Sequence, residues 1–236
     1  DERFYLLPPS IPLEKFAGKN RKQCRQYVRA QFNLPENANI ILTVGSAFVR
    51  KGVDRTIEAL AALPKALQDN TWLIAIGEYE SKSDMQTYAK DRHIAHRCIQ
   101  AGGRDDVADL MVGADVLAHP ARSELAGIVL IEAMTAGLPV LVTDVCGYAP
   151  HIAQANAGVV LTAPYQQESM NAALADMLQS EQKTVWQING EQYTQHIKNT
   201  TSATAEADYL ITLANKKLPR PQAGEGWGEG VLNEST

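Results

Sequence analysis

Two adjacent cations, Arg50 and Lys51, stand between an apolar run that ends at Gly45 and a helical pattern that begins after Gly52. Exposed backbone N–H groups and the positive end of the helix dipole favour an anion at such a helix start. Arginine and lysine add charge-assisted hydrogen bonds to phosphate oxygens. The segment therefore predicts a loop that binds a diphosphate, with two solvated surface cations as the alternative. The sequence has neither a P-loop motif nor a GxGxxG motif after a strand.

Two carboxylates, Glu124 and Glu132, are separated by seven residues in a second candidate segment. At about 100° per residue they would lie roughly 80° apart around a helix, so we expect them to have different roles. Because Pro120 and Gly127 interrupt the helical pattern, we expect Glu124 in a strand-to-helix loop and the second carboxylate inside the helix. A carboxylate among apolar residues needs partners. For Glu132 these are either the hydroxyls of a ligand or a cation from a neighbouring loop.

One histidine, His119, directly precedes Pro120 at the end of an expected strand. A histidine at a strand end favours a structural role, and an approach to the diphosphate is the alternative. The other histidines show no metal-ligand spacing, and the sequence contains no DxD motif. We therefore expect no metal, with Arg50, Lys51 and helix dipoles taking the place of a divalent ion at the leaving group.

The elements that must position these residues follow an αβ alternation with a period of about thirty residues. Near-continuous apolar strands indicate burial on both faces, which predicts an α/β fold with a Rossmann-like, doubly wound parallel sheet. Glycines follow three of the strand ends, at Gly45, Gly77 and Gly102–Gly103, where ligands of open α/β sheets bind. The expected strands are Asn39–Val44, Trp72–Ile76, Arg97–Ala101, Asp115–Ala118, Pro139–Val142 and Gly158–Leu161, with helices near Lys19–Phe32 and at Gln167–Gln179.

The composition is that of a soluble globular chain, with 236 residues of which 45% are hydrophobic and 21% charged. A net charge of -5 argues against a nucleic-acid partner. The longest apolar stretch, Leu125–Val142, contains Glu132 and Pro139, so it predicts a helix, a turn and a strand rather than a membrane span. Three widely spaced cysteines suggest neither disulfides nor zinc, and they favour a cytoplasmic location.

Four ordered motifs resemble the retaining glycosyltransferases of family 4, which have the GT-B fold. These motifs are GSAFVRKGVDRTIEALAALP, GRDDVADLM, ADVLAHPARSELAGIVLIEAMTAGLPVL and VCGYA. The hallmarks of the family, an Arg-Lys-Gly clamp and two glutamates seven residues apart, stand at Arg50–Gly52 and at Glu124 and Glu132. The resemblance covers roughly Leu6–Ala214 and is closest to the lipopolysaccharide core glucosyltransferases.

The resemblance implies the C-terminal, donor-binding half of a GT-B enzyme. Residues 1–38 would contain an interdomain linker, since Phe4–Pro12 resembles that of the family, and a peripheral helix. Residues 39–215 would form the nucleotide-sugar donor-binding domain, with a last helix at Ala203–Lys217. Residues 216–236 are rich in Gly, Pro and Glu, and we expect them to be disordered.

The same resemblance assigns roles to individual residues. Arg50 and Lys51 would bind the donor diphosphate, and together with Glu124, which would contact the sugar hydroxyls, they would form the catalytic group. Glu132 would hold the ribose hydroxyls. The backbone amides at the second helix start would meet phosphate or sugar oxygens, and the uracil would lie near Gly103. The full set of implied binding residues is Gly45, Arg50, Lys51, Gly103, Arg104, Glu124, Ala126, Gly127, Ile128 and Glu132.

The implied reaction is retaining transfer of glucose from UDP-glucose to a heptose of the lipopolysaccharide inner core, without a cofactor or metal. The acceptor would bind to an N-terminal domain that this chain lacks, so the chain alone would bind the donor and transfer little. The full enzyme would be cytoplasmic, with peripheral association at the inner membrane as a further expectation. Two alternatives stay open: a non-catalytic nucleotide-sugar binding module, and a UDP-sugar epimerase of the same fold.

Overall fold

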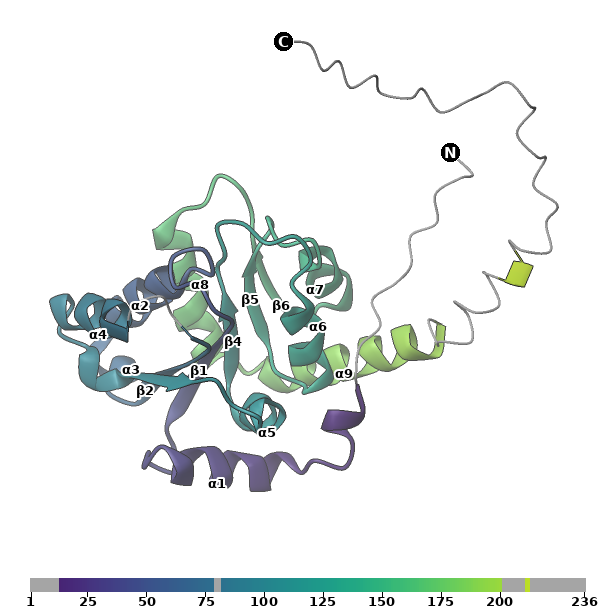
Figure 1. Cartoon of the computed structure of the whole chain (residues 1–236), viewed down its shortest axis with the longest axis horizontal. Helices are drawn as coiled ribbons and strands as arrows, with labels where there is room; N and C mark the ends of the chain where they lie inside the picture. Colours follow the sequence, from purple (N-terminus) through teal and green to yellow (C-terminus); the bar gives the residue numbers. More distant parts are fainter. Residues whose placement is uncertain (1–12, 79–81, 201–210, 213–236) are drawn as a thin grey trace, which may run out of the picture.

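The computed structural model describes residues 13–78, 82–200 and 211–212. Its centre is a parallel sheet with the strand order β3-β2-β1-β4-β5-β6 (Figure 1). The expected linker at Phe4–Pro12, most of the expected helix at Ala203–Lys217 and the tail at 216–236 lie outside the described residues. The α/β, Rossmann-like, doubly wound parallel sheet predicted from the sequence is confirmed.

The strands lie where the apolar runs predict them, within two residues at each end. They are β1 Asn39–Val44, β2 Thr71–Ile76, β3 Cys98–Gly102, β4 Val116–His119, β5 Val140–Thr143 and β6 Gly158–Leu161. Every pairing in the sheet is parallel. The strand order reverses direction between β1 and β4, which makes the carboxyl ends of these two strands the ligand-binding crevice of such a sheet.

Helices cover both faces of the sheet (Figure 1). The α-helices are α1 Arg21–Gln31, α2 Val53–Ala61, α3 Lys65–Gln68, α4 Lys82–Asp91, α5 Val107–Gly113, α6 Ile128–Thr135, α7 Ala149–Ala155, α8 Gln167–Gln179 and α9 Lys183–Thr200, and the short 3-10 helices are η1 Leu13–Phe16 and η2 Ala95–Arg97. One apolar cluster joins α1, α5, α6 and α7 to one face, and a second joins α2, α4 and α8 to the other. The alternation of side chains along the buried strands separates the two clusters.

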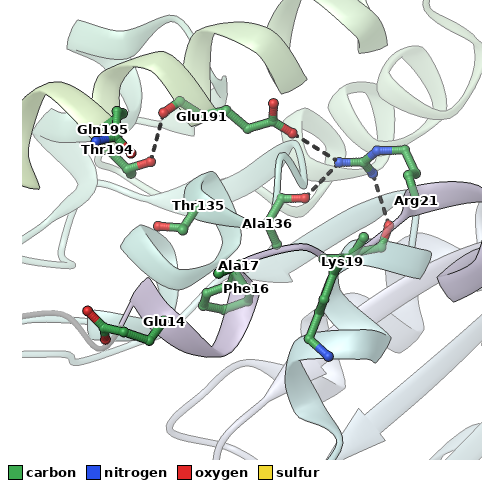
Figure 2. Close-up of a pocket in the computed structure, with 11 residues that line it drawn as sticks. Glu14, Phe16, Ala17, Lys19, Arg21, Thr135, Ala136, Glu191, Thr194 and Gln195 are labelled. Carbon is green, nitrogen blue, oxygen red and sulfur yellow. Dashed lines mark hydrogen bonds and ion pairs between the residues drawn. The ribbon is translucent and has the colours of Figure 1, made fainter.

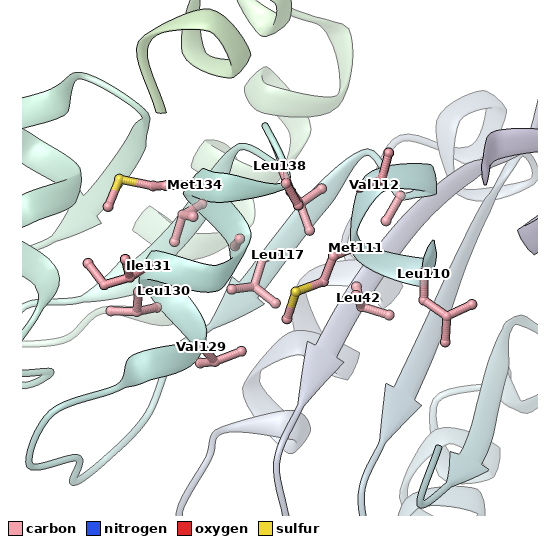
Figure 3. Close-up of a cluster of buried hydrophobic side chains, with 14 of the residues drawn as sticks. Leu42, Leu110, Met111, Val112, Leu117, Val129, Leu130, Ile131, Met134 and Leu138 are labelled. Carbon is pink, nitrogen blue, oxygen red and sulfur yellow. The ribbon is translucent and has the colours of Figure 1, made fainter. Parts of the chain in front are cut away.

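The core beside the candidate site is built on α6 (Figure 3). Leu130, Ile131 and Met134 of this helix are fully buried against Leu117 of β4 and Met111 of α5. Full burial of each such side chain contributes roughly 1.5–3 kcal/mol. Because most side chains of α6 are buried in the core, its surroundings fix the helix, and the start of α6 has a defined position at the end of β4.

The helix expected near Lys19–Phe32 is present as α1 and belongs to the packed domain. Its Val28 is fully buried in the core cluster. The buried Arg29 pairs with Asp115 at 3.1 Å and donates to the Gly113 carbonyl at 3.1 Å. Asp115 also accepts from the Ile40 amide at 2.8 Å, so this ion pair ties α1 to the start of β1.

Candidate functional site

Three loops meet at the carboxyl ends of β1, β4 and β5. Gly52, the residue that precedes α2, has a left-handed backbone with φ of 75°, and a Cβ there would lie 2.1 Å from the carbonyl oxygen of Pro120. Gly147, in the third loop, approaches the loop of Pro120 equally closely, since a Cβ added to it would lie 2.1 Å from the carbonyl oxygen of Leu125. The 120–127 loop is therefore in backbone contact with both the 45–52 loop and the 144–148 loop, and both contacts require glycine.

Hydrogen bonds fix the first two loops to one another. The Arg122 amide donates to the Arg50 carbonyl at 2.9 Å. The Arg122 side chain binds both carboxylate oxygens of Asp54, at 2.8 and 2.6 Å, and the Val49 carbonyl at 2.6 Å. Arg55 adds a bond of 3.1 Å to the Pro120 carbonyl. This bracing holds the backbone that carries the two expected phosphate-binding cations.

The carboxylate of Glu124 is the centre of the charged cluster at the site. Its Oε2 accepts a hydrogen bond from the Lys51 ammonium and lies 3.7 Å from Nη1 of Arg50. Nε2 of His119 lies 3.6 Å from the same oxygen. The stem of Lys51 crosses Gly45, where an added Cβ would lie 3.2 Å from its Cε. The structure thus brings the predicted diphosphate-binding cations Arg50 and Lys51 together with the predicted sugar-binding Glu124. His119, for which the sequence favours a structural role, lies beside them.

Charge and burial set the protonation of this cluster. Burial opposes ionisation of Glu124, but the hydrogen bond and the positive charge of Lys51 outweigh it and lower the pKa of the carboxyl. Burial, and then repulsion by Lys51, lower the pKa of His119 to about 4, although Glu124 acts in the opposite direction. The resting site therefore holds an ionised carboxylate beside a neutral imidazole.

The start of α6 completes the site. Gly127 caps this helix with a left-handed backbone of φ 82°, and among the described residues no side chain bonds to the helix start. The Ala126 carbonyl accepts from the Tyr148 amide at 2.8 Å, which holds the turn in place. Leu125 is 97% exposed, so the turn itself faces solvent. The amides of Ala126, Gly127 and Ile128 lie at a helix terminus suited to an anion, as the sequence predicts.

Glu132 lies inside α6 and has a separate partner. Its carboxylate forms an ion pair with the ammonium of Lys15 on η1. Of the two partners left open by the sequence, the chain itself supplies the cation, while ligand hydroxyls stay a prediction. Because Glu124 pairs with Lys51, the two glutamates have different environments, as their helical spacing predicts.

The residues expected near the uracil lie at the end of β3. Arg104 binds Asp106 through Nε at 2.7 Å and Nη2 at 2.6 Å, and its guanidinium lies 5.3 Å from the ring centroid of Phe32. The Cβ position of Gly103 lies 3.9 Å from Oε1 of Glu78. The guanidinium of Arg104 is thus engaged within the chain, and the role of this segment in base binding stays a prediction.

The Arg104–Asp106 pair predicts a change in acid stability. The hydrogen bonds from Arg104 lower the pKa of Asp106 from 3.8 to about 2. A depressed carboxyl pKa adds stability above its ordinary value that is lost as the pH falls through the lowered one. When the pH is lowered from about 4 to about 2, Arg104→Gln should therefore lose less stability than wild type. The difference between the two losses should be about 1 kcal/mol or less, because the pair lies near the surface. Urea unfolding at both pH values measures this, and equal losses would contradict it.

A separate cavity of about 400 Å³ lies between η1, α1, α9 and the end of α6 (Figure 2). There Arg21 donates to the Ala136 carbonyl at 2.7 Å and lies 3.6 Å from Glu191 of α9. Ala136 ends α6, whereas Gly127 begins it, so this cavity is at the opposite end of the helix from the charged cluster.

Two groups around the site were not singled out from the sequence. The Asp54–Arg122 pair joins residues far apart in the chain, and no spacing predicts it. Lys15 precedes α1 in a segment interpreted as linker, where its pairing with Glu132 has no sequence signal. Within the described ranges, no group of three or more His, Cys, Asp or Glu side chains could hold a metal ion. In that same part of the chain, no helix is both long and apolar enough to cross a membrane.

Comparison with known proteins identifies the family to which this chain belongs. The family model "Glycosyl transferases group 1" matches residues 25–200, so the chain belongs to this glycosyltransferase family. It is 44% identical over 193 residues to the lipopolysaccharide glucosyltransferase WaaG of Escherichia coli K12, covering 81% of this chain and 51% of WaaG. The chain thus spans about half the length of this relative.

Solved structures agree on the fold. A crystal structure of WaaG, a glycosyltransferase involved in lipopolysaccharide biosynthesis, superposes with a TM-score of 0.80 at 42% identity, over 89% of this chain and 57% of that one. The C-terminal domain of a group 1 glycosyltransferase, LpcC of Francisella tularensis, gives a TM-score of 0.68 at 18% identity, over 79% of this chain and 97% of that domain. The predicted GT-B-like fold is confirmed.

Proposed function

We propose that this chain is the donor-binding half of a retaining glycosyltransferase that transfers glucose from UDP-glucose to a heptose of the lipopolysaccharide inner core. The observation that carries the proposal is the convergence of Lys51 and Arg50 on Glu124 beside the start of α6. The 44% identity to a lipopolysaccharide glucosyltransferase supports the choice of donor and acceptor class.

The charged cluster suits a departing nucleoside diphosphate. In the resting chain, Lys51 and Arg50 neutralise the carboxylate of Glu124. A diphosphate carries more negative charge than one carboxylate, so both cations turn toward it when the donor binds. Together with the start of α6, they stabilise the charge that develops on UDP as the glycosidic bond breaks. This arrangement performs the electrostatic work of a divalent ion with side chains and backbone alone.

The two glutamates hold the sugars of the donor. Once Lys51 turns to the diphosphate, the ionised Glu124 accepts hydrogen bonds from hydroxyls of the glucose. Glu132 accepts from the ribose hydroxyls, and Lys15 remains beside it to balance its charge. The hydroxyls of UDP-glucose thus satisfy carboxylates that are each largely buried, at 14% and 15% side-chain exposure.

The acceptor completes the reaction on a second domain. The chain covers 51% of the WaaG sequence, and GT-B enzymes bind donor and acceptor on opposite sides of an interdomain cleft. The chain alone therefore binds UDP-glucose and transfers little. The complete enzyme acts on the cytoplasmic side of the inner membrane, where it associates peripherally with its lipid-linked acceptor.

Calorimetric titration with UDP, UDP-glucose and ADP-glucose in the presence of EDTA tests the donor assignment. We expect uridine-selective binding without metal. Glu132→Gln should weaken both uridine ligands by roughly tenfold or more, the effect of losing hydrogen bonds to a charged group. Glu124→Gln should weaken UDP-glucose more than UDP. Equal affinities in wild type and both variants would refute the site assignment, and binding that requires a metal would refute the metal-free donor site.

A further inference from the structure

We propose that His119 is a positioning residue that replaces Lys51 as the partner of Glu124 when UDP-glucose binds, and that the imidazole takes up a proton from solvent as it does so. The inference rests on the proposed function, because it needs a donor that draws Lys51 away. It adds a specific event to donor binding, a change of partner at the Glu124 carboxylate.

His119 lies close to the Glu124 carboxylate without forming a hydrogen bond to it. The side chain is 1% exposed at the end of β4, and its Nε2 has no hydrogen-bond partner within the described part of the chain. Buried polar atoms are normally paired, and an orphaned one calls for an explanation. Nε2 lies 3.6 Å from Oε2 of Glu124, slightly beyond hydrogen-bonding distance. A small movement would therefore bring this carboxylate within hydrogen-bonding distance of the imidazole.

Lys51 prevents that bond in the resting chain. Its ammonium donates to Oε2 of Glu124, the same oxygen that faces the imidazole. Burial first, and the positive charge of Lys51 second, lower the pKa of His119 to about 4. Arg50, whose Nη1 lies 3.7 Å from that oxygen, acts in the same direction. The imidazole of His119 is therefore neutral in the resting chain, and the carboxylate oxygen that faces it is already bonded to Lys51.

Binding of the donor reverses the sign of the charge around His119. Before binding, the imidazole faces two cations, Lys51 and Arg50, and one carboxylate, Glu124, which leaves a net positive surrounding. The diphosphate adds two negative charges and pulls both cations toward itself, which leaves a net negative surrounding. A nearby negative charge favours the imidazolium, so the pKa of His119 rises on binding.

The other groups near the carboxylate do not take the proton in this scheme. The backbone of Cys146 on the third loop forms an isolated parallel β-bridge with that of Glu124. Burial raises the pKa of the Cys146 thiol to about 11, so the thiol is already protonated. Glu124 itself is the competing acceptor. Protonated Glu124 could donate to a sugar oxygen but would lose its charge, whereas an imidazolium keeps the carboxylate ionised and holds it in place.

Calorimetric titration with UDP-glucose near pH 7, in buffers that differ in ionisation enthalpy, measures the proton uptake. UDP-glucose is the suitable probe because its diphosphate is esterified at both ends and does not titrate near neutrality, unlike the terminal phosphate of UDP. We expect a binding heat that depends on the buffer in wild type. We also expect affinity to rise several-fold as the pH falls by about one unit.

The variants separate His119 from other groups. In His119→Gln, the buffer dependence should disappear and the affinity should fall several-fold. His151→Gln is the control, because His151 is partly buried and its ring nitrogen bonds to the hydroxyl of Tyr193 at 2.8 Å instead of facing a carboxylate. It should keep the buffer dependence of wild type. The nitrogen chemical shifts of labelled His119 in wild type, with and without UDP-glucose, report the same protonation without any substitution.

Three results would overturn the inference. Binding with no buffer dependence would mean that the imidazole stays neutral. The same proton uptake in His119→Gln as in wild type would assign the proton to Glu124. Imidazole shifts of a neutral ring in the donor complex would exclude the change of partner. In each case UDP-glucose still binds, so the proposed function stands, whereas a wild-type chain that binds no UDP-glucose would refute both.

Discussion

Lys51→Met should weaken binding of UDP-glucose by roughly 10- to 100-fold, the loss expected when a charge-assisted hydrogen bond to phosphate is removed. Methionine keeps the length and apolar volume of the stem, which crosses Gly45. The variant should also be less stable in the absence of ligand. Glu124, at 14% side-chain exposure, would lose its bonded cation at a cost of about 1–3 kcal/mol. Calorimetric titration and urea unfolding measure the two effects separately.

A double substitution distinguishes the two roles of Lys51. In Lys51→Met/Glu124→Gln the uncompensated carboxylate is gone, so most of the lost stability should return while the affinity stays low. Lys65→Met is the surface control, because the Lys65 side chain is 77% exposed and its one ion pair among the described residues is with Asp69, directly after α3. It should change neither quantity measurably. If Lys51→Met bound UDP-glucose as tightly as wild type, the assignment of this loop to the diphosphate would be wrong.

The fold was predictable wherever local pattern and burial agree. β1 and β6 have the bounds predicted from their apolar runs, and α8 has the predicted bounds Gln167–Gln179. β4 extends one residue further than predicted because His119 pairs with Val142 of β5, a contact that depends on the neighbouring strand. The helix α9 was not predicted. Its sequence is mostly polar, and it is held by contacts such as Gly190 against Met134, which no local pattern reveals.

Some parts of the candidate site were likewise predictable from local sequence, and others were not. Arg50, Lys51 and Glu124 were predicted because strand ends, glycines and charges stand close together in the sequence. Their meeting at one oxygen follows from the adjacency of β1 and β4, a consequence of the doubly wound order. The ion pairs that brace the site depend on distances between separate loops. Asp54 and Arg122 are one such pair, and such contacts appear only once the fold is known.

The contact between the first two loops predicts the largest loss of stability. Gly52→Ala would place a Cβ 2.1 Å from the Pro120 carbonyl oxygen, a backbone atom, at a residue with φ of 75°. The left-handed backbone alone costs about 1–2 kcal/mol for a non-glycine residue, and the collision should add a further 1–3 kcal/mol or more. Because the loop must shift, Arg50 and Lys51 move with it, and UDP-glucose affinity should fall as well.

Gly18→Ala isolates the collision from the strain. Gly18 has nearly the same backbone, with φ of 71°, but apart from its chain neighbours no atom of the described residues lies within 4 Å of its Cβ position. This variant should lose only the cost of the left-handed backbone and should bind UDP-glucose as wild type does. Urea unfolding of both variants, with calorimetric titration of each, tests the difference. Equal losses of stability would show that the backbone strain accounts for everything and that the approach of Gly52 to Pro120 does not hold the two loops together. A destabilised Gly52→Ala with wild-type affinity would instead show that the position of the cations does not depend on this contact. The hydrogen bonds from Arg122 to the Arg50 and Val49 carbonyls would then maintain that position.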